Sequence, residues 1–446
     1  MKLPHLHPIT PVLAILIATS SNLPAQEAIA LVERFSAGTE YGVNARVKLK
    51  GELAVPVDKD KPPQLTKLEG RSSINYDERI LTAEPKIADQ RTIRKYDTID
   101  FRRSAGDRIQ EISLRADVRR LVVMKRKNAK VPFSPDGPLT WGEIDMLRTD
   151  IFVPGLAGIL PDRAVKPGDA WKVTDAAVAE LTDLEKIDSG SIECKFEQID
   201  TFDGKKYANL SLSGDLRGVN EDGPNRQKLT GRLYFDLKSN FISYLSINGE
   251  HELLDKDGKV NGRITGEFVM ARRLNPNNPA LTAAALANVA LEPTADNTLL
   301  LFEEPDLGMR MLHPRRWRIG RVQKGQITLD ESNGSGLLIT VEFPDRVPTT
   351  PAYMKEVNNY LAGQNAKILR ADKAVQLEKA PSELDRFQID AEIAGQRVKM
   401  DYFIARQANA GATFAARILE EDREALAKEV ERMARSLRMT RKFEKK

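Results

Sequence analysis

The sequence predicts an α+β protein: a large curved antiparallel sheet or half-barrel with a crossing helix, followed by a smaller α/β/α sandwich. Three observations predict this class. Between Tyr41 and Leu274, apolar and polar residues alternate with period two, and short turns interrupt the alternation. The segment 275–298 is instead rich in proline, asparagine and alanine and has no Lys or Arg. Beyond it, strand-like runs are mixed with two apolar stripes at helical spacing.

The first 25 residues have the organisation of an export signal. Lys2 precedes an apolar run at 12–18, and polar residues lead to Ala25. The apolar run is about eight residues, far below the roughly 20 needed to cross a bilayer. We expect cleavage after Ala25, although Leu23 leaves the exact position open. The sequence therefore predicts a periplasmic or secreted protein, with no integral membrane span in the mature chain.

Composition narrows the possible chemistry. The formal net charge is +4 over 446 residues, which does not indicate a polyanionic partner for the whole chain. Cys194 is the one cysteine, so no intramolecular disulfide can form. Cys194 shares a face of its alternating run with Ile192 and Phe196, and we expect it to be buried as a small apolar residue.

The region 26–274 is predicted to be one β-rich domain. Turn dipeptides Asp203-Gly204, Ser239-Asn240 and Asp257-Gly258 separate successive runs, as in a meander of antiparallel strands with one buried face. The expected strands are 43–55, 67–82, 91–103, 108–115, 118–126, 190–200, 206–216, 227–237, 241–254 and 260–272.

The meander is interrupted at 139–160, where apolar residues recur at helical spacing. We expect one helix there, laid across the concave side of the sheet. Together with the inner faces of the strands within 229–270, it would line an apolar ligand cleft. The candidate cleft residues are Trp141, Ile144, Leu147, Ile151, Phe235 and Phe268.

The stretch 160–173, LPDRAVKPGDAWKV, predicts a bend rather than a binding site. Pro167 presets the first central position of a turn, and Gly168 can take the positive φ that a type II turn requires next. Asp169 can accept hydrogen bonds from nearby amides. Trp171 then begins the strand that follows.

After the linker 275–298, which contains a short helix around 280–291, the segment 299–440 is expected to form the second domain, with 441–446 as a basic tail. Helices are expected at 351–363 and 422–437. The expected strands are 308–313, 316–323, 326–331, 336–343, 368–378, 384–393, 396–406 and 412–419.

Basic residues concentrate between 91 and 130, where thirteen Lys or Arg stand against five acids. A solvated sheet face explains such a run, and attraction to anionic lipid headgroups or other envelope polyanions is the functional alternative. Nucleic acid is not indicated, given the expected export and the lack of aromatic residues within the patch at 119–127. The candidate basic rim is Arg119, Arg120, Lys125, Arg126 and Lys127.

Motifs for catalysis or metal binding are incomplete. His251 and His313 are the histidines outside the signal, and they fall in different predicted domains. The run 251–255, HELLD, has Asp where a zinc protease needs its second His. The run 255–258, DKDG, is predicted to be a hairpin turn rather than a calcium loop. We therefore predict no catalytic residue, no metal site and no cofactor.

Two family resemblances add to this interpretation. The run 308–317, GMRMLHPRRW, is similar to the opening of the PsbP/DcrB-type α/β/α sandwich, and the resemblance continues through 332–336 to Ser436-Leu437-Arg438. It departs at Arg315-Arg316, where a small residue is typical. It implies an accessory or assembly protein without a catalytic site. The meander within 27–274 faintly resembles LolA-like incomplete β-barrels, which implies a concave face for a lipid or a lipidated segment.

The function predicted from the sequence is that of an exported, non-enzymatic envelope protein that binds an amphipathic ligand or a protein partner. Two alternatives stay open: a hydrolase acting on envelope polymers, and a purely structural scaffold. A hydrolase would require a cleft that holds two carboxylates, one of them with a raised pKa. The sequence does not determine the ligand, the partner or the oligomeric state.

Overall fold

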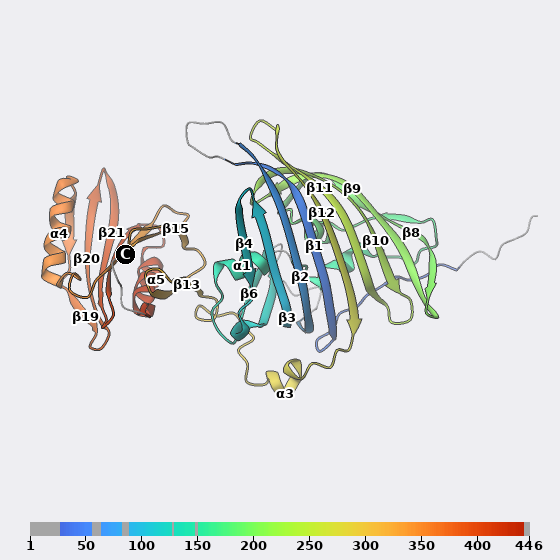
Figure 1. Ribbon diagram of the computed structural model, residues 1–446, viewed down its shortest axis with the longest axis horizontal. Coiled ribbons are helices and arrows are strands. Elements are labelled where there is room, and N and C mark those ends of the chain that lie inside the picture. Colours follow the sequence, from blue (N-terminus) through green and yellow to red (C-terminus); the bar gives the residue numbers. More distant parts are fainter. Residues whose placement is uncertain (1–26, 56–63, 83–88, 127–128, 148–149, 441–446) are drawn as a thin grey trace, which may run out of the picture.

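The structure is a computed structural model that describes residues 27–55, 64–82, 89–126, 129–147 and 150–440. The expected signal peptide 1–25, the basic tail 441–446 and Lys127 lie outside the described residues. The described chain forms antiparallel sheets of twelve, three and eight strands, with short helices packed on them (Figure 1). The predicted α+β class is confirmed.

The twelve-stranded sheet is built by the first 274 residues. Its strand order is β6-β5-β3-β2-β1-β12-β11-β10-β9-β8-β7, with β4 paired to β3, and β6 and β7 form its two open ends. The strands are β1 (Glu40–Val55), β2 (Gln64–Thr82), β3 (Asp89–Ala105), β4 (Arg108–Ser113), β5 (Arg120–Arg126), β6 (Ala129–Phe133), β7 (Ala170–Lys172), β8 (Lys186–Phe202), β9 (Lys205–Asn220), β10 (Gly223–Asp236), β11 (Phe241–Leu254) and β12 (Val260–Leu274).

The predicted hairpins are present in this sheet. Asp203 and Gly204 join β8 to β9, Asn240 lies between β10 and β11, and Gly258 lies between β11 and β12, each at positive φ. Such backbone lets a tight turn follow the twist of the flanking strands. Because successive side chains of a strand point to opposite faces, every second side chain lies on the face that packs into the main core.

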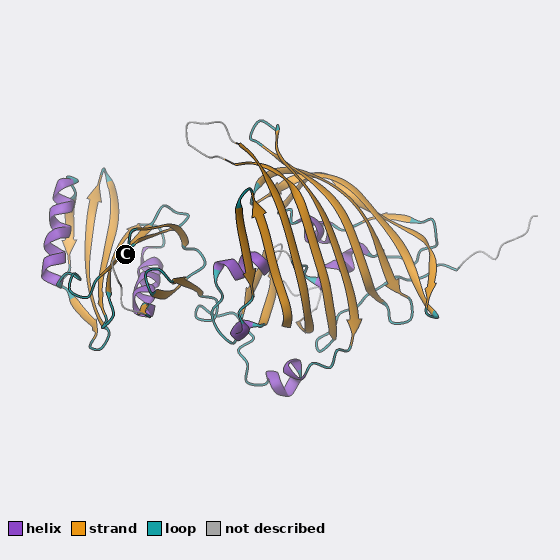
Figure 2. Ribbon diagram, in the orientation of Figure 1, coloured by secondary structure: helices purple, strands orange, loops and turns teal. Residues whose placement is uncertain are grey.

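The buried face of the sheet is covered by short helical segments of its own chain (Figure 2). One helix across 139–160 was predicted, but the described residues contain two shorter helical segments. Pro154, Gly155 and Gly158 in the second segment disfavour a continuous α-helix. The segments on this part are α1 (Trp141–Leu147), α2 (Asp175–Thr182) and the 3-10 helices η1 (Ala116–Val118) and η2 (Val153–Ile159).

The stretch 160–173 is a bend, as predicted. Gly168 has φ +97°, and the Asp169 amide donates to the Lys166 carbonyl at 3.0 Å, which closes the turn. Asp169 Oδ2 accepts from the Lys166 amide at 3.0 Å. Trp171 then lies in β7, and its Nε1 donates to the Ile159 carbonyl at 2.8 Å. The turn anchors η2 to the edge of the sheet.

The segment 275–298 packs on the first sheet. It contains the 3-10 helix η3 (Pro279–Leu281) and α3 (Ala283–Leu286), a shorter helix than the one expected around 280–291. Leu281 and Leu286 are buried against β3, β5 and β6. The proposed domain boundary in this segment stays a prediction.

The last part of the chain is an eight-stranded sheet between two helices, with a three-stranded sheet beside it (Figure 1). One core joins α4 to one face of the large sheet and another joins α5 to the opposite face, as an α/β/α sandwich requires. The helices are α4 (Thr350–Gly363) and α5 (Arg423–Ser436), and the strands are β13 (Leu300–Glu304), β14 (Met309–His313), β15 (Arg318–Gln323), β16 (Gln326–Asp330), β17 (Gly336–Glu342), β18 (Lys367–Ala371), β19 (Val375–Glu378), β20 (Glu383–Ile393), β21 (Gln396–Arg406), β22 (Gly411–Leu419) and β23 (Arg438–Met439).

The two parts of the chain touch at several points. Leu139 and Leu300 form a parallel bridge, and the Leu301 amide donates to the Leu139 carbonyl at 2.8 Å. Leu300 is fully buried within the core of the first sheet. The contacts lie beside α1, at the end of the sheet formed by β5 and β6, and they frame the candidate site described next. None of the helices described is long and apolar enough to cross a membrane.

Candidate functional site

A cavity of about 340 Å³ lies where α1 and the end of α2 meet β6 and the segment before β15. Ligand pockets commonly have volumes of about 300–1,000 Å³, so this one would hold a small ligand. Both parts of the chain contribute to its wall. Its lining carries four basic and four acidic side chains beside apolar ones: Lys125, Lys130, Val131, Pro132, Trp141, Ile144, Leu147, Ala179, Glu180, Asp183, Leu184, Glu185, Glu221, Arg315 and Arg318.

The apolar wall of the cavity comes mainly from α1. Ile144 and Leu147 are buried in the main core and present one side to the cavity, whereas Trp141 is partly buried. The Arg318 guanidinium carbon lies 3.9 Å from the centre of the Trp141 ring. A cation above an indole face is attracted by the ring quadrupole. Trp141 therefore fixes the position of a cation next to an apolar surface.

Two arginines contribute positive charge without a carboxylate partner. Arg315 donates from Nε to the Thr298 carbonyl at 3.0 Å and from Nη2 to the Pro132 carbonyl. Neither Arg315 nor Arg318 forms an ion pair with a carboxylate in the described part of the chain. Burial lowers the pKa of Arg315 to about 10, because the charged guanidinium is removed from water.

The lysines of the cavity are neutralised by one buried glutamate. Lys125 Nζ lies 2.5 Å and Lys130 Nζ 2.9 Å from the carboxylate oxygens of Glu180, which also accepts from the Phe152 amide at 2.6 Å. Burial alone would raise the pKa of Glu180, but Lys130 and Lys125 outweigh it and lower the pKa to about 2. Glu180 is therefore ionised at neutral pH and is unsuited to act as a general acid.

The predicted cleft residues are divided between the cavity and the core. Trp141, Ile144 and Leu147 line the cavity. Phe235 is fully buried in the main core, and Ile151 and Phe268 pack against that core from its margin. The six residues do not form one open concave surface, because η2, α2 and the N-terminal segment around Leu31 occupy the concave side.

Most described side chains of the predicted basic rim already pair with other groups of the protein. Arg120 pairs with Asp136 at 2.5 Å, Arg119 donates to the Asp97 carbonyl at 3.1 Å, and Lys125 pairs with Glu180. The side chain of Arg126 and all of Lys127 lie outside the described residues. Among the described members, Lys125 alone lines the cavity.

Sequence reasoning missed Lys130, Glu180, Arg315 and Arg318 as site residues. Glu180 lies on α2, which was not predicted, and its buried position depends on tertiary packing. The pair Arg315-Arg316 carried a signal, because it replaces the small residue that is typical of the resembling family at this point. The structure gives Arg315 a place in the cavity wall.

The cavity holds four carboxylates, as a hydrolytic cleft would, but none of the described carboxyl groups with a raised pKa is among them. The carboxyl groups with a raised pKa are those of Asp150 and Asp401, raised by burial although arginines lie beside them. Neither residue lines the cavity. No group of three or more His, Cys, Asp or Glu in the described part could hold a metal ion.

Comparison with known proteins gives no family. No family model and no curated protein matches the chain. Among solved structures, PsbP of Synechocystis sp. PCC 6803 is 14% identical, with 32% of this chain and 92% of that chain covered and a TM-score of 0.26. A lipovitellin structure on lipid–protein interactions is 8% identical, with coverages of 56% and 27% and a TM-score of 0.32.

MucB, in complex with MucA, is 10% identical, with coverages of 89% and 93% and a TM-score of 0.14. At TM-scores below 0.5, none of these three likenesses supports an inference about what this chain binds or does.

Proposed function

We propose that this is a non-enzymatic binding protein of the bacterial envelope that holds a small amphipathic anion in the cavity between its two parts. The proposal rests on one observation: in the wall of the cavity, apolar side chains lie beside two arginines. Trp141, Ile144 and Leu147 offer apolar contact, and beside them Arg315 and Arg318 have no described carboxylate partner. A ligand with a short apolar tail and an anionic head matches both surfaces.

The anionic head is supported by the environment of Arg315. Arg315 is half-buried and bonds to backbone carbonyls rather than to a carboxylate, and its lowered pKa reflects the partial removal of its charge from water. A carboxylate or phosphate near Arg315 and Arg318 would supply charge-assisted hydrogen bonds. The proposed envelope location rests on the export signal expected at 1–25.

The alternative functions receive less support. A hydrolase needs a carboxylate with a raised pKa in its cleft, whereas the pKa of Glu180 is lowered to about 2. A pure scaffold needs no cavity. It would therefore give no function to the cavity wall in which Arg318 lies over Trp141. A protein partner that inserts an acidic or apolar side chain into the cavity is the second candidate.

Calorimetric titration with decanoate tests the proposal, because decanoate is small, apolar along its tail and anionic at its head. We expect the mature chain to bind it and Arg318→Gln to weaken binding by about tenfold, since one charge contact is worth about 1.4 kcal/mol here. Arg318 is exposed, so the substitution leaves the core intact.

Arg321→Gln is the matched control, because Arg321 is also exposed on β15 but does not line the cavity. Equal affinity of all three proteins, or binding of decanol as tight as that of decanoate, would contradict the anion site. No binding of either compound would favour the protein-partner candidate.

A further inference from the structure

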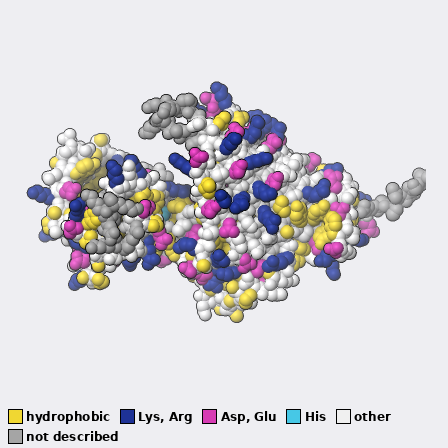
Figure 3. Space-filling model, viewed as in Figure 1, with side chains coloured by type: hydrophobic (Ala, Val, Ile, Leu, Met, Phe, Trp, Pro, Cys, Tyr) yellow, Lys and Arg dark blue, Asp and Glu magenta, His cyan; other side chains and the backbone are white. Residues whose placement is uncertain are grey.

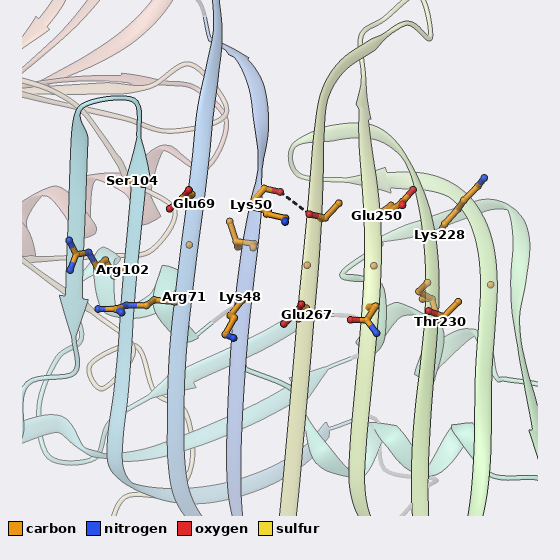
Figure 4. A pocket seen from close by; sticks show the side chains of 18 of the residues that line it. Lys48, Lys50, Glu69, Arg71, Arg102, Ser104, Lys228, Thr230, Glu250 and Glu267 are labelled. Carbon is orange, nitrogen blue, oxygen red and sulfur yellow. Dashed lines mark hydrogen bonds between the residues drawn. The ribbon is translucent and has the colours of Figure 1, made fainter.

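Three cations stand side by side on the face of the first sheet that is turned away from the helices. Arg102 on β3 is directly opposite Arg71 on β2, which is directly opposite Lys48 on β1. Figure 4 shows these side chains on the same face, with the helices behind the strands. Directly paired residues of antiparallel strands have Cα atoms about 4.5–5.5 Å apart. The three charges are therefore neighbours.

This row is unfavourable by itself. Like charges directly opposite each other destabilise a sheet. A carboxylate is directly opposite each end of the row: Glu111 is opposite Arg102, at an ion-pair distance of 3.2 Å with both partners largely exposed, and Glu267 is opposite Lys48. Such exposed pairs contribute little, about 0–1 kcal/mol. Arg71, in the centre, has a cation on both sides and no described ion-pair partner.

A long groove runs past the row and across the strands, with a volume of about 1590 Å³. It extends from β4 to β9, between two rows of outward side chains (Figure 4). The floor of the groove includes the backbone of Gly70, Gly266 and Gly249. A second groove of about 630 Å³ also borders Lys48, Arg71 and Arg102. The three cations therefore lie between two depressions of this face.

The charges change along the groove. Glu69 and Lys50 line the groove across from Arg71 and Lys48. Beyond β1 the lining includes Glu267, Glu250, Lys228 and Asp215, next to the uncharged polar side chains of Thr265, Asn248 and Thr230. Figure 3 shows basic and acidic side chains intermingled over this face. An occupant that is anionic along its whole length would be repelled by Glu267 and Glu250. One anionic group at one end, followed by an uncharged hydroxyl-rich chain, matches the lining.

We propose that this groove binds an acidic oligosaccharide, with its carboxylate or phosphate at Arg71 between Arg102 and Lys48. The uncharged sugar units then run over β12, β11 and β10, where Thr265, Asn248 and Thr230 exchange hydrogen bonds with hydroxyl groups. An anionic lipid surface is the weaker occupant, because it would bring negative charge against the carboxylates on the same face. This site is separate from the cavity at α1.

Saturation-transfer NMR with 3′-sialyllactose tests the site, because this trisaccharide has one carboxylate at one end of neutral sugar units. We expect saturation to be transferred from the mature protein to 3′-sialyllactose and not to lactose. Arg71→Gln should weaken binding by about tenfold or more. Arg71 is exposed and unpaired in the described structure, so the variant should fold, as its circular dichroism and melting temperature will show.

Arg232→Gln is the control variant, because Arg232 is exposed on the same face of β10 but lines neither groove. Transfer that is equal in wild type, Arg71→Gln and Arg232→Gln would overturn the proposal. So would co-sedimentation with phosphatidylglycerol vesicles in the absence of sialyllactose transfer, which would assign the row to a membrane. Failure of decanoate binding at the cavity leaves this test unaffected.

Discussion

At the scale of single residues, buried charge is concentrated around Arg94. Its guanidinium lies 2.9 Å from Glu78 and 2.7 Å from Asp150, and it donates to the Ile151 carbonyl at 3.0 Å. Tyr96 also donates to Asp150, at 2.7 Å. The network connects the central strands to the chain that leads into η2. It therefore helps to hold the segments that fill the concave side.

Replacing Arg94 by methionine should destabilise the protein by about 3–5 kcal/mol, because the carboxylates of Glu78 and Asp150 would stay buried without a counter-charge. Urea unfolding at pH 7 measures the change. Arg103→Met on the same strand is the control, since Arg103 is exposed. Similar losses for the two variants would contradict a structural role for the buried network.

Glu180 should make stability depend on pH in the acid range. Its folded pKa of about 2 lies below the ordinary 4.5, so its contribution is present above pH 4.5 and is lost as the pH falls towards 2. Glu180→Gln should cost on the order of 3 kcal/mol at pH 7 and flatten this acid dependence.

Unfolding free energies measured from pH 7 down to pH 3 test this, with Glu193→Gln on an exposed position of β8 as control. A Glu180→Gln profile parallel to that of the wild type would show that the Lys125–Glu180–Lys130 contacts do not stabilise the fold.

Several single-residue features were predictable because they depend on local pattern. Cys194 is fully buried, as its place between Ile192 and Phe196 indicates. Burial raises the pKa of its thiol. The roles of Glu180 and Arg315 were not predictable, because partners far away in sequence determine them. Period-two alternation identifies a buried face but not what covers it.

At the scale of elements, turn chemistry explains why most strands begin and end where they were predicted. The bend at 166–169 depends on Gly168, which has φ +97° and open space around the position of a Cβ atom. Two elements were missed: β6 is short, and α2 begins at a capping residue, Thr174, whose side chain accepts from the Ala177 amide, a signal that was not used. The prediction of a single helix at 139–160 was wrong, because Pro154 and the nearby glycines disfavour a continuous α-helix there.

Gly168→Ala should therefore destabilise the protein by about 1 kcal/mol through backbone strain alone, since no atom obstructs the new methyl group. Gly363→Ala is the matched comparison: it also meets no atom, it lies in α4 without positive φ, and it should be neutral or stabilising. Thermal unfolding of the two variants measures the difference. Equal melting temperatures would contradict the assigned turn.

At the scale of the whole molecule, the two parts are joined by contacts that also form the cavity. Arg318 reaches Trp141, Arg315 reaches the Pro132 carbonyl, and Leu300 enters the core of the first sheet. A ligand in the cavity would touch both parts and stabilise their contact. The sequence predicted the curved sheet and the α/β/α sandwich. It could not predict the contacts between them, because no local sequence pattern indicates which surfaces pack together.

A crystal structure of the mature protein grown with decanoate would show whether the cavity beside α1 holds an amphipathic anion. We expect density for one decanoate with its tail along Trp141, Ile144 and Leu147 and its carboxylate within hydrogen-bond distance of Arg315 or Arg318. An empty cavity, or decanoate bound only elsewhere on the molecule, would contradict it.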